Sequence, residues 1–299
     1  PRKIGVVPGI FADSVEAAAK EAKKQGLDVQ LVEFTDWATP NVALDAGDID
    51  LNYYQNSNYL ANAVRDKGFK ITSVQAGILS YLGLYSLRHK SLADLPVGAK
   101  VAIGSDAVNL GRGLRLVQAA GLIKLRPDIG LLGKTSDIVD NPKKLQFVEV
   151  EGPQLVRVTP DVDLAVGYPY FILASKAFDA TKGLAYTSYE DDSWAIQFVA
   201  RTDKAADPRI AQFLNIYKNS DVVQDHPRVL PQRPEALPPG LAEELSRALS
   251  MANSKRHIHV NAFNMNCVGH IHHGLWTHPR DQSTRYNTLQ YWTDMARTL

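Results

Sequence analysis

One short stretch of the chain gathers aromatic and amide side chains: residues 52–59 read NYYQNSNY. The stretch lies at the end of an apolar segment, Ile49–Tyr53, that predicts a β-strand. Open α/β sheets bind ligands beyond the carboxyl ends of their strands, and ligand pockets combine apolar walls with a few polar groups. We therefore expect Tyr54, Gln55 and Asn56 to contact a small ligand. The alternative is a polar turn that leads into a surface helix.

A second stretch, residues 105–112, combines a predicted helix start with a cation. Asn109 is expected to cap the helix, which places Arg112 in its first turn, where the helix macrodipole disfavours a positive charge. A bound anion reverses that penalty, because free backbone N–H groups and a guanidinium together form a receptor for a carboxylate. The alternative is a solvated surface arginine.

The remaining composition excludes several classes of function. Residues 1–226 contain no nucleophile elbow, phosphate loop, dinucleotide fingerprint or pair of carboxylates, so we expect neither catalysis nor a cofactor there. Lys+Arg 33 against Asp+Glu 32 leaves a formal charge of +1, which argues against a nucleic-acid partner. No apolar run reaches the roughly 18 residues of a membrane span. The single cysteine, Cys267, excludes an internal disulfide and a cysteine-rich zinc site.

Hydrophobic periods of 2 and 3.6 residues alternate through residues 1–226. Strands are expected at Lys3–Val7, Leu27–Phe34, Ile49–Tyr53, Lys100–Ile103, Leu145–Val150, Asp163–Tyr168 and Ile196–Arg201. Helices are expected from Asp13 or Ser14 to Gly26, from a Thr39 cap to Ala46, over Leu110–Ala120 and over Pro208–Lys218. This order is typical of parallel sheets covered by helices, so we predict an α/β protein with two lobes and a cleft between them.

The predicted domain organisation follows from this order and from a change of composition near residue 227. Lobe 1 is expected to hold residues 1–80 and 195–226, and lobe 2 residues 81–194. Five prolines between Pro227 and Gly240 favour extended chain, so 227–250 is predicted to be a proline-rich linker that ends in a short amphipathic helix. All three methionines and six of the eight histidines lie in 251–299, which marks a segment of different origin.

Ordered segments along the first 219 residues resemble the NlpA/MetQ family, the methionine-binding lipoproteins of ABC importers. They are Pro40–Leu44, Gly47–Asp50, Lys90–Pro96, Asn109–Arg112, Ala120–Leu125, Asn141–Leu145 and Pro153–Leu155. The resemblance implies a two-lobed periplasmic-binding-protein (type II) fold that closes on an amino acid and delivers it to an ABC permease. It also implies a periplasmic lipoprotein, anchored to the inner membrane through a lipid-bearing cysteine that precedes the first strand.

The pocket departs from the family's pattern. Gln55 and Arg112 are kept, whereas Asn56 stands where the family often has histidine, and Tyr168 and Ile196 stand near its two asparagines. Losing these amides predicts that ordinary methionine binds poorly and that a more apolar solute, such as an organosulfur acid, binds better. Additional aromatics, among them Tyr53 and Tyr170, support such a ligand or pack inside a lobe or hinge. The expected ligand-binding set is Tyr54, Gln55, Asn56, Tyr81, Asn109, Arg112, Tyr168 and Trp194.

Residues 251–299 have a second resemblance, carried by His257–Asn266, Gly269–Trp276, Arg285–Asn287 and Tyr291–Trp292. They look like the beginning of flavin-dependent monooxygenases of the nitrilotriacetate and dibenzothiophene-sulfone type, which form TIM barrels. A barrel needs roughly 200 residues or more, so these 49 residues are too few for a flavin site. An enzyme whose catalytic unit continues this segment is the alternative function, and its clustered histidines raise metal binding as an alternative to the monooxygenase resemblance.

Overall fold

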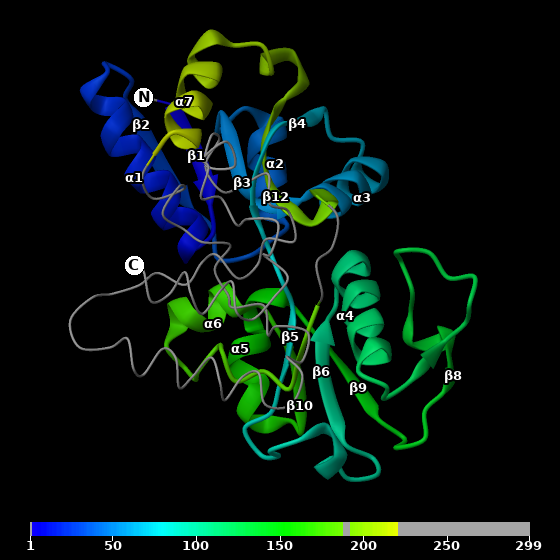
Figure 1. Ribbon diagram of the computed structural model, residues 1–299. Helices are drawn as coiled ribbons and strands as arrows, with labels where there is room; N and C mark the ends of the chain where they lie inside the picture. The colour runs from blue at the N-terminus through cyan, green and yellow to red at the C-terminus, as the bar shows by residue number, and fades with distance from the viewer. Residues whose placement is uncertain (1, 188–191, 221–299) are drawn as a thin grey trace, which may run out of the picture. The chain divides into compact units, whose positions relative to one another are not determined.

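Two five-stranded sheets carry the fold of the computed structural model, which describes residues 2–187 and 192–220 (Figure 1). The first sheet has the strand order β2-β1-β3-β12-β4. Its strands are β1 (Arg2–Val6), β2 (Val29–Glu33), β3 (Leu51–Asn56), β4 (Ile71–Leu79) and β12 (Ala195–Arg201). Strand β1 runs parallel to β2 and β3, whereas β12 runs antiparallel to β3 and β4. The carboxyl ends of β1, β2 and β3 therefore meet at one end of the sheet.

The second sheet has the order β11-β5-β10-β6-β9. Its strands are β5 (Gly83–Tyr85), β6 (Lys100–Gly104), β9 (Gln146–Val150), β10 (Leu164–Gly167) and β11 (Ala185–Tyr186). Strands β10, β6 and β9 are parallel, and β5 runs antiparallel to β10. A separate two-stranded ribbon pairs β7 (Lys124–Leu125) with β8 (Ile138–Asp140).

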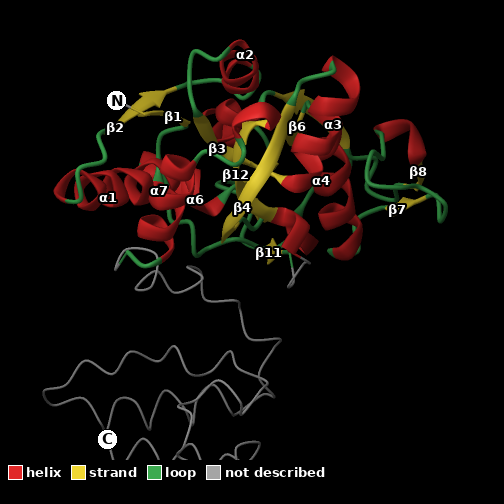
Figure 2. Ribbon diagram, turned by 90° about the horizontal axis from the view of Figure 1, so that it is seen from above, coloured by secondary structure: helices red, strands yellow, loops and turns green. Residues whose placement is uncertain are grey.

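Helices pack beside both sheets (Figures 1 and 2). The α-helices are α1 (Ile10–Lys24), α2 (Thr39–Ala46), α3 (Ser57–Lys67), α4 (Ala107–Ala119), α5 (Leu155–Val158), α6 (Pro169–Ser175) and α7 (Pro208–Lys218). Short 3₁₀ turns are η1 (Leu92–Asp94), η2 (Thr135–Asp137), η3 (Gly152–Gln154), η4 (Thr159–Asp161), η5 (Asp192–Trp194) and η6 (Thr202–Lys204). Helices α1 and α7 pack on each other beside the first sheet, with Val15 and Phe213 in the shared core. The predicted bounds of α2 and α7 are confirmed.

Three predicted helix caps are wrong. Helix α1 begins earlier, after Gly9 (φ 122°), so Ser14 lies inside the helix, where its buried hydroxyl donates to the Phe11 carbonyl at 2.8 Å. Helix α2 has no side-chain cap from Thr39, because the Asp36 carboxylate accepts from the backbone N–H groups of Ala38 and Thr39. Helix α4 is capped by Asp106, whose side chain accepts from the backbone N–H of Asn109 at 2.9 Å.

The chain crosses between the sheets twice. It leaves the first sheet after Leu79, reaches the second at Gly83, and returns between Tyr186 and Ala195. Each sheet has its own large hydrophobic cluster, one including Phe198 and the other Leu164. This arrangement is a two-lobed α/β fold, as predicted.

Part of the prediction falls outside the described residues. This holds for the proline-rich linker, its short helix and the whole of 251–299. Within the described ranges, no helix is both long enough and apolar enough to cross a membrane.

Candidate functional site

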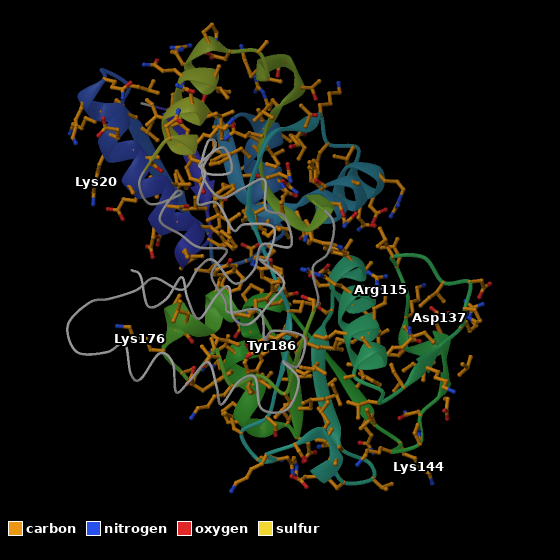
Figure 3. The ribbon with its side chains drawn as sticks, in the orientation of Figure 1. Lys20, Arg115, Asp137, Lys144, Lys176 and Tyr186 are labelled. Atoms are coloured by element: carbon orange, nitrogen blue, oxygen red, sulfur yellow. The ribbon has the colours of Figure 1, made fainter. Side chains whose placement is uncertain are left out.

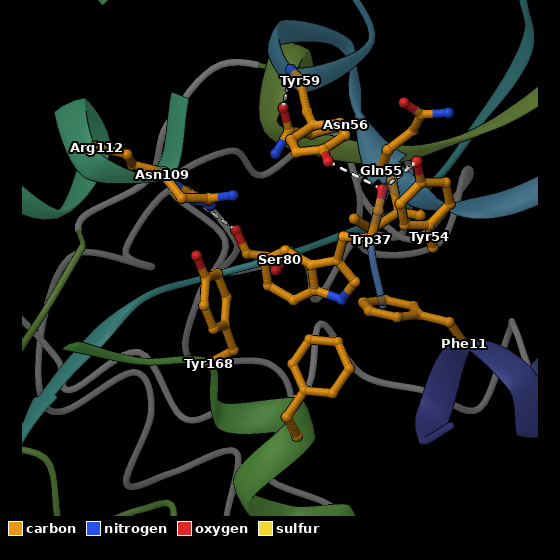
Figure 4. Close-up of a pocket in the computed structure, with 12 residues that line it drawn as sticks. Phe11, Trp37, Tyr54, Gln55, Asn56, Tyr59, Ser80, Asn109, Arg112 and Tyr168 are labelled. Carbon is orange, nitrogen blue, oxygen red and sulfur yellow. Dashed lines mark hydrogen bonds between the residues drawn. The ribbon is translucent and has the colours of Figure 1, made fainter. Parts of the chain in front are cut away.

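A pocket of about 380 Å³, counted with the open space at its mouth, draws its walls from elements beside both sheets (Figure 4). Its walls come from α1, the loop before α2, β3, α3, the first crossing, α4, the β10–α6 turn, α6 and β12. The lining residues are Phe11, Trp37, Tyr54, Gln55, Asn56, Tyr59, Ser80, Asn109, Arg112, Tyr168, Phe171 and Ile196. Phe11 and Trp37 follow β1 and β2, so three parallel strands point their carboxyl ends at this pocket, as the general rule for open sheets requires.

Arg112 is the only charged residue among the described lining residues. It lies in the second turn of α4, one turn later than predicted, because the helix starts at Ala107. The side chain is buried, with 1% of its surface exposed, and its Nη2 donates to the Ser80 carbonyl at 2.6 Å. A buried guanidinium in a pocket wall is suited to binding a carboxylate or a similar oxyanion.

Tyr168 supplies a second polar group. Burial, with Asp106 as the next contribution, raises the pKa of its phenol well above the usual value, so the hydroxyl stays neutral and able to donate. The hydroxyl is buried and has no hydrogen-bond partner among the described residues. In Figure 4 it points toward the Asn109 side of the pocket. Leaving such a group unsatisfied is costly, so an acceptor on a bound solute would relieve that cost.

The three predicted amides have unequal freedom. The Gln55 amide is engaged on both sides, since Nε2 donates to Asn41 Oδ1 at 2.6 Å and Oε1 accepts from Asn41 Nδ2 at 2.9 Å. Gln55 therefore lines the pocket, as predicted, with its amide already paired within the fold. Asn109 donates from Nδ2 to Asp106 at 2.8 Å. Asn56 caps α3 by accepting from Tyr59 N at 2.9 Å, and no described residue accepts from its Nδ2.

Aromatic rings form the apolar wall. The hydroxyls of Tyr54 and Tyr59 both donate to the Trp37 carbonyl at 2.9 Å, which fixes the loop before α2 (Figure 4). The Trp37 ring lies 5.3 Å from the Tyr168 ring and 5.7 Å from the Phe171 ring, measured between centroids. Burial is the main cause that raises the pKa of both Tyr54 and Tyr59. The wall is uncharged and suits an apolar side chain.

Two predicted ligand residues are not in the pocket lining. Tyr81 is buried in the first crossing, and Trp194 stacks on the guanidinium of Arg112, with Arg112 Cζ 4.2 Å from its ring centroid. Tyr53 and Tyr170 belong to the core around the first sheet, where the Tyr53 ring stacks on Phe198 at 4.0 Å. Tyr54, Gln55, Asn56, Asn109, Arg112 and Tyr168 do line the pocket.

Most of the aromatic wall lies at positions that were not predicted from the sequence. The missed lining residues are Phe11, Trp37, Tyr59, Ser80 and Phe171. The rule applied to the third strand would also have pointed to Phe11 and Trp37, because each follows a parallel strand. Among the described residues no group of His, Cys, Asp and Glu is arranged to hold a metal ion.

Known proteins that resemble this chain in sequence and in fold identify its family. The profile of the NlpA lipoprotein family matches residues 3–227. The D-methionine-binding lipoprotein MetQ of Yersinia pestis is 39% identical over 222 residues, which covers 74% of this chain and 82% of that protein.

Two solved structures share the fold. An ABC transporter periplasmic substrate-binding protein from Coxiella burnetii superposes with a TM-score of 0.70 at 32% identity, covering 75% of this chain and 94% of that one. A nutrient-binding protein from Burkholderia cenocepacia, bound to methionine, gives 0.71 at 36% identity over 75% and 94% of the two chains. The chain therefore belongs to the NlpA lipoprotein family, and it is a periplasmic substrate-binding protein rather than an enzyme.

Proposed function

We propose that this chain is the solute-binding component of an ABC importer and that its solute is a methionine-like amino acid or an organosulfur acid. The observation that carries the proposal is the buried guanidinium of Arg112 in a pocket whose other described lining residues are uncharged. The acid group of the solute binds to Arg112, and its apolar part lies against the aromatic wall. The methionine bound to the Burkholderia relative supports a ligand of this size and chemistry.

Within this class, we infer that an acid without an amino group binds more tightly than methionine. Ile196 presents a hydrocarbon surface to the pocket, and the Gln55 amide is already paired with Asn41. An α-ammonium group buried among such neighbours loses hydration without gaining matching acceptors, which costs binding free energy. An organosulfur acid avoids that cost.

The proposal extends to the organisation of the chain. We infer that lobe 1 comprises residues 1–80 and 195–226 and lobe 2 residues 81–194, a division supported by the strands of each sheet. The partner is an ABC permease, and the protein is held at the inner membrane as a lipoprotein.

Residues 251–299 remain a predicted monooxygenase-like fragment, and the family favours solute binding over the flavin-enzyme alternative.

A thermal-shift panel tests the ligand class. The panel is L-methionine, D-methionine, 3-(methylthio)propanoate and, as a control without an acid group, methioninol. A ligand at about 100 times its Kd stabilises the fold by about 2.7 kcal/mol. We expect the largest rise in Tm with 3-(methylthio)propanoate and almost none with methioninol. The largest shift with methionine would contradict the preference within the class, and an equal shift with methioninol would contradict acid binding at Arg112.

A further inference from the structure

Trp194 is a buried aromatic residue that neither lines the pocket nor belongs to a described hydrophobic cluster. It ends η5 in the second crossing, and 5% of its surface is exposed. None of the four clusters of buried apolar residues in the described part of the chain includes it. A buried tryptophan usually packs in a core, so the contacts of this ring need another explanation.

The ring of Trp194 faces two arginines of α4. The guanidinium carbon Cζ of Arg112 lies 4.2 Å from the ring centroid, and that of Arg115, one turn further along the helix (Figure 3), lies at 5.9 Å. A guanidinium within about 6 Å of an indole face is attracted to it, and the attraction grows when both groups are removed from water. Arg112 is the closer and the more deeply buried of the two.

Both crossings hold Arg112. The Ser80 carbonyl of the first crossing accepts from Nη2 at 2.6 Å, while Trp194 of the second crossing lies against the guanidinium. The residue before it, Ser193, accepts a hydrogen bond from Asn58 of α3 at 2.9 Å. The second crossing is therefore tied to a helix beside the first sheet, whereas Arg112 belongs to α4, which packs on β6 of the second.

We propose that Trp194 is a positioning residue, which holds the Arg112 guanidinium from the second crossing in the orientation that binds the solute's acid group. The stack joins a residue of the second crossing to α4, so it forms only in lobe arrangements that keep α4 against that crossing. Acid binding is thereby coupled to the arrangement of the lobes. This inference rests on the proposed function of Arg112 as the acid-binding group.

A measurement without ligand tests the stack itself. A guanidinium 4.2 Å from an indole ring lies in the ring current, so NMR should show an upfield-shifted Arg112 side chain, assigned by its loss in Arg112→Gln. Trp194→Leu should return that signal to an ordinary position, and Trp194→Phe should keep part of the shift. An Arg112 signal that does not move in Trp194→Leu would overturn the proposal.

A double-mutant cycle then tests the positioning role. Calorimetry would use 3-(methylthio)propanoate and L-methionine with Trp194→Leu, Trp194→Phe, Arg112→Gln and the double variant Arg112→Gln with Trp194→Leu. We expect Trp194→Leu to weaken solute binding about tenfold. Trp194→Phe should keep most of the wild-type affinity, because its ring can still stack on the guanidinium. In the Arg112→Gln background, Trp194→Leu should weaken binding no further, because the two residues act as one unit. Arg115→Lys is the matched control and should leave affinity unchanged.

The outcomes separate this inference from the proposed function. If Arg112→Gln weakens binding strongly while Trp194→Leu binds as tightly as the wild type, the positioning role is wrong and the proposed function stands. If Trp194→Leu weakens binding by the same factor in the wild type and in the Arg112→Gln variant, the two effects are additive. That result would also overturn the positioning role, since it indicates that the tryptophan acts independently of Arg112. If Arg112→Gln itself leaves affinity unchanged, acid binding at Arg112 fails and the positioning role fails with it.

Discussion

At the scale of single residues, Tyr168 and Tyr81 form a matched pair of buried tyrosines. Neither hydroxyl has a hydrogen-bond partner among the described residues, and each side chain is 5% exposed. They differ in place, because Tyr168 lines the pocket and Tyr81 does not. Comparing the two residues therefore separates the effect of a hydroxyl that can bind a solute from the effect of a hydroxyl that is only buried.

We predict that Tyr168→Phe weakens binding of the acid solute about tenfold or more, since a hydrogen bond to a charged group contributes about 1.5–3 kcal/mol. The free protein should keep or slightly raise its Tm, because the substitution removes an unsatisfied buried hydroxyl. Tyr81→Phe should have the same small effect on Tm and leave affinity unchanged. Calorimetry and thermal melts on the two variants check this, and equal affinities for both would remove Tyr168 from the binding site.

Arg112 shows what the sequence predicts about a residue and what it does not. Its place in a ligand pocket follows from a helix start after a strand, together with the family resemblance. The predicted place of Arg112 in the first turn, at the positive end of the helix macrodipole, is wrong, since Asp106 caps α4 and Arg112 falls in the second turn. Its guanidinium is held instead by Ser80 and Trp194, which are 32 and 82 positions away in the sequence. Local spacing carries no information about such partners.

At the scale of elements, β3 (Leu51–Asn56) extends further into the amide-rich stretch than the predicted strand Ile49–Tyr53. All six of its residues are buried, including Asn52 and Gln55, although amides argue against a buried strand. The structure resolves the conflict through Asn41 of α2, whose side chain exchanges hydrogen bonds with Gln55 and accepts one from Asn52 Nδ2. The aromatic and amide stretch that was predicted to follow a strand is therefore largely the strand itself. Periodicity located β1, β2, β6, β9, β10 and β12, whereas β4, β5, β7, β8 and β11 were not predicted.

The turn η3 meets the loop before α2 at Gly152. A Cβ added to this glycine would overlap the Cζ3 and Cη2 carbons of the Trp37 indole, so the ring lies directly on the glycine backbone. The same ring contacts Tyr168 and Phe171. Trp37 thus connects elements beside both sheets while forming part of the pocket wall.

We predict that Gly152→Ala displaces the Trp37 ring and weakens solute binding, with an overpacking cost of about 1–3 kcal/mol. Gly130→Ala is the control, because nothing lies within 4 Å of a Cβ at that position. Adding Trp37→Leu to Gly152→Ala should relieve the overlap and recover part of the lost Tm. Full wild-type affinity in Gly152→Ala would show that binding does not need the indole against this turn.

At the scale of the whole molecule, two α/β lobes followed from the alternation of strands and helices, whereas the composition of the pocket did not. Seven separate segments of the chain contribute to its described lining, from Phe11 to Ile196. Periodicity predicts each segment separately, but which side chains meet is decided by the two crossings, where the chain passes between the sheets. The sequence thus shows that aromatic residues gather near the ends of strands. Only the fold shows which of them line the pocket and which, such as Tyr53, pack in the core.

The last prediction concerns how much of the chain solute binding requires. The family match ends at residue 227, all described pocket residues precede residue 197, and the five prolines begin at Pro227. Ordering additional polar chain against the lobes costs about 1–2 kcal/mol per residue in conformational entropy, a cost that only a large apolar contact offsets.

A chain ending at Pro227 should therefore keep its Tm within about 2 °C and its affinity for 3-(methylthio)propanoate within about twofold of the full chain. Limited proteolysis of the full chain should cut first between Arg228 and Arg256. A large loss of Tm or affinity on truncation would show instead that residues beyond 227 contribute to the binding unit, and their aromatic and histidine side chains would then be the first to substitute.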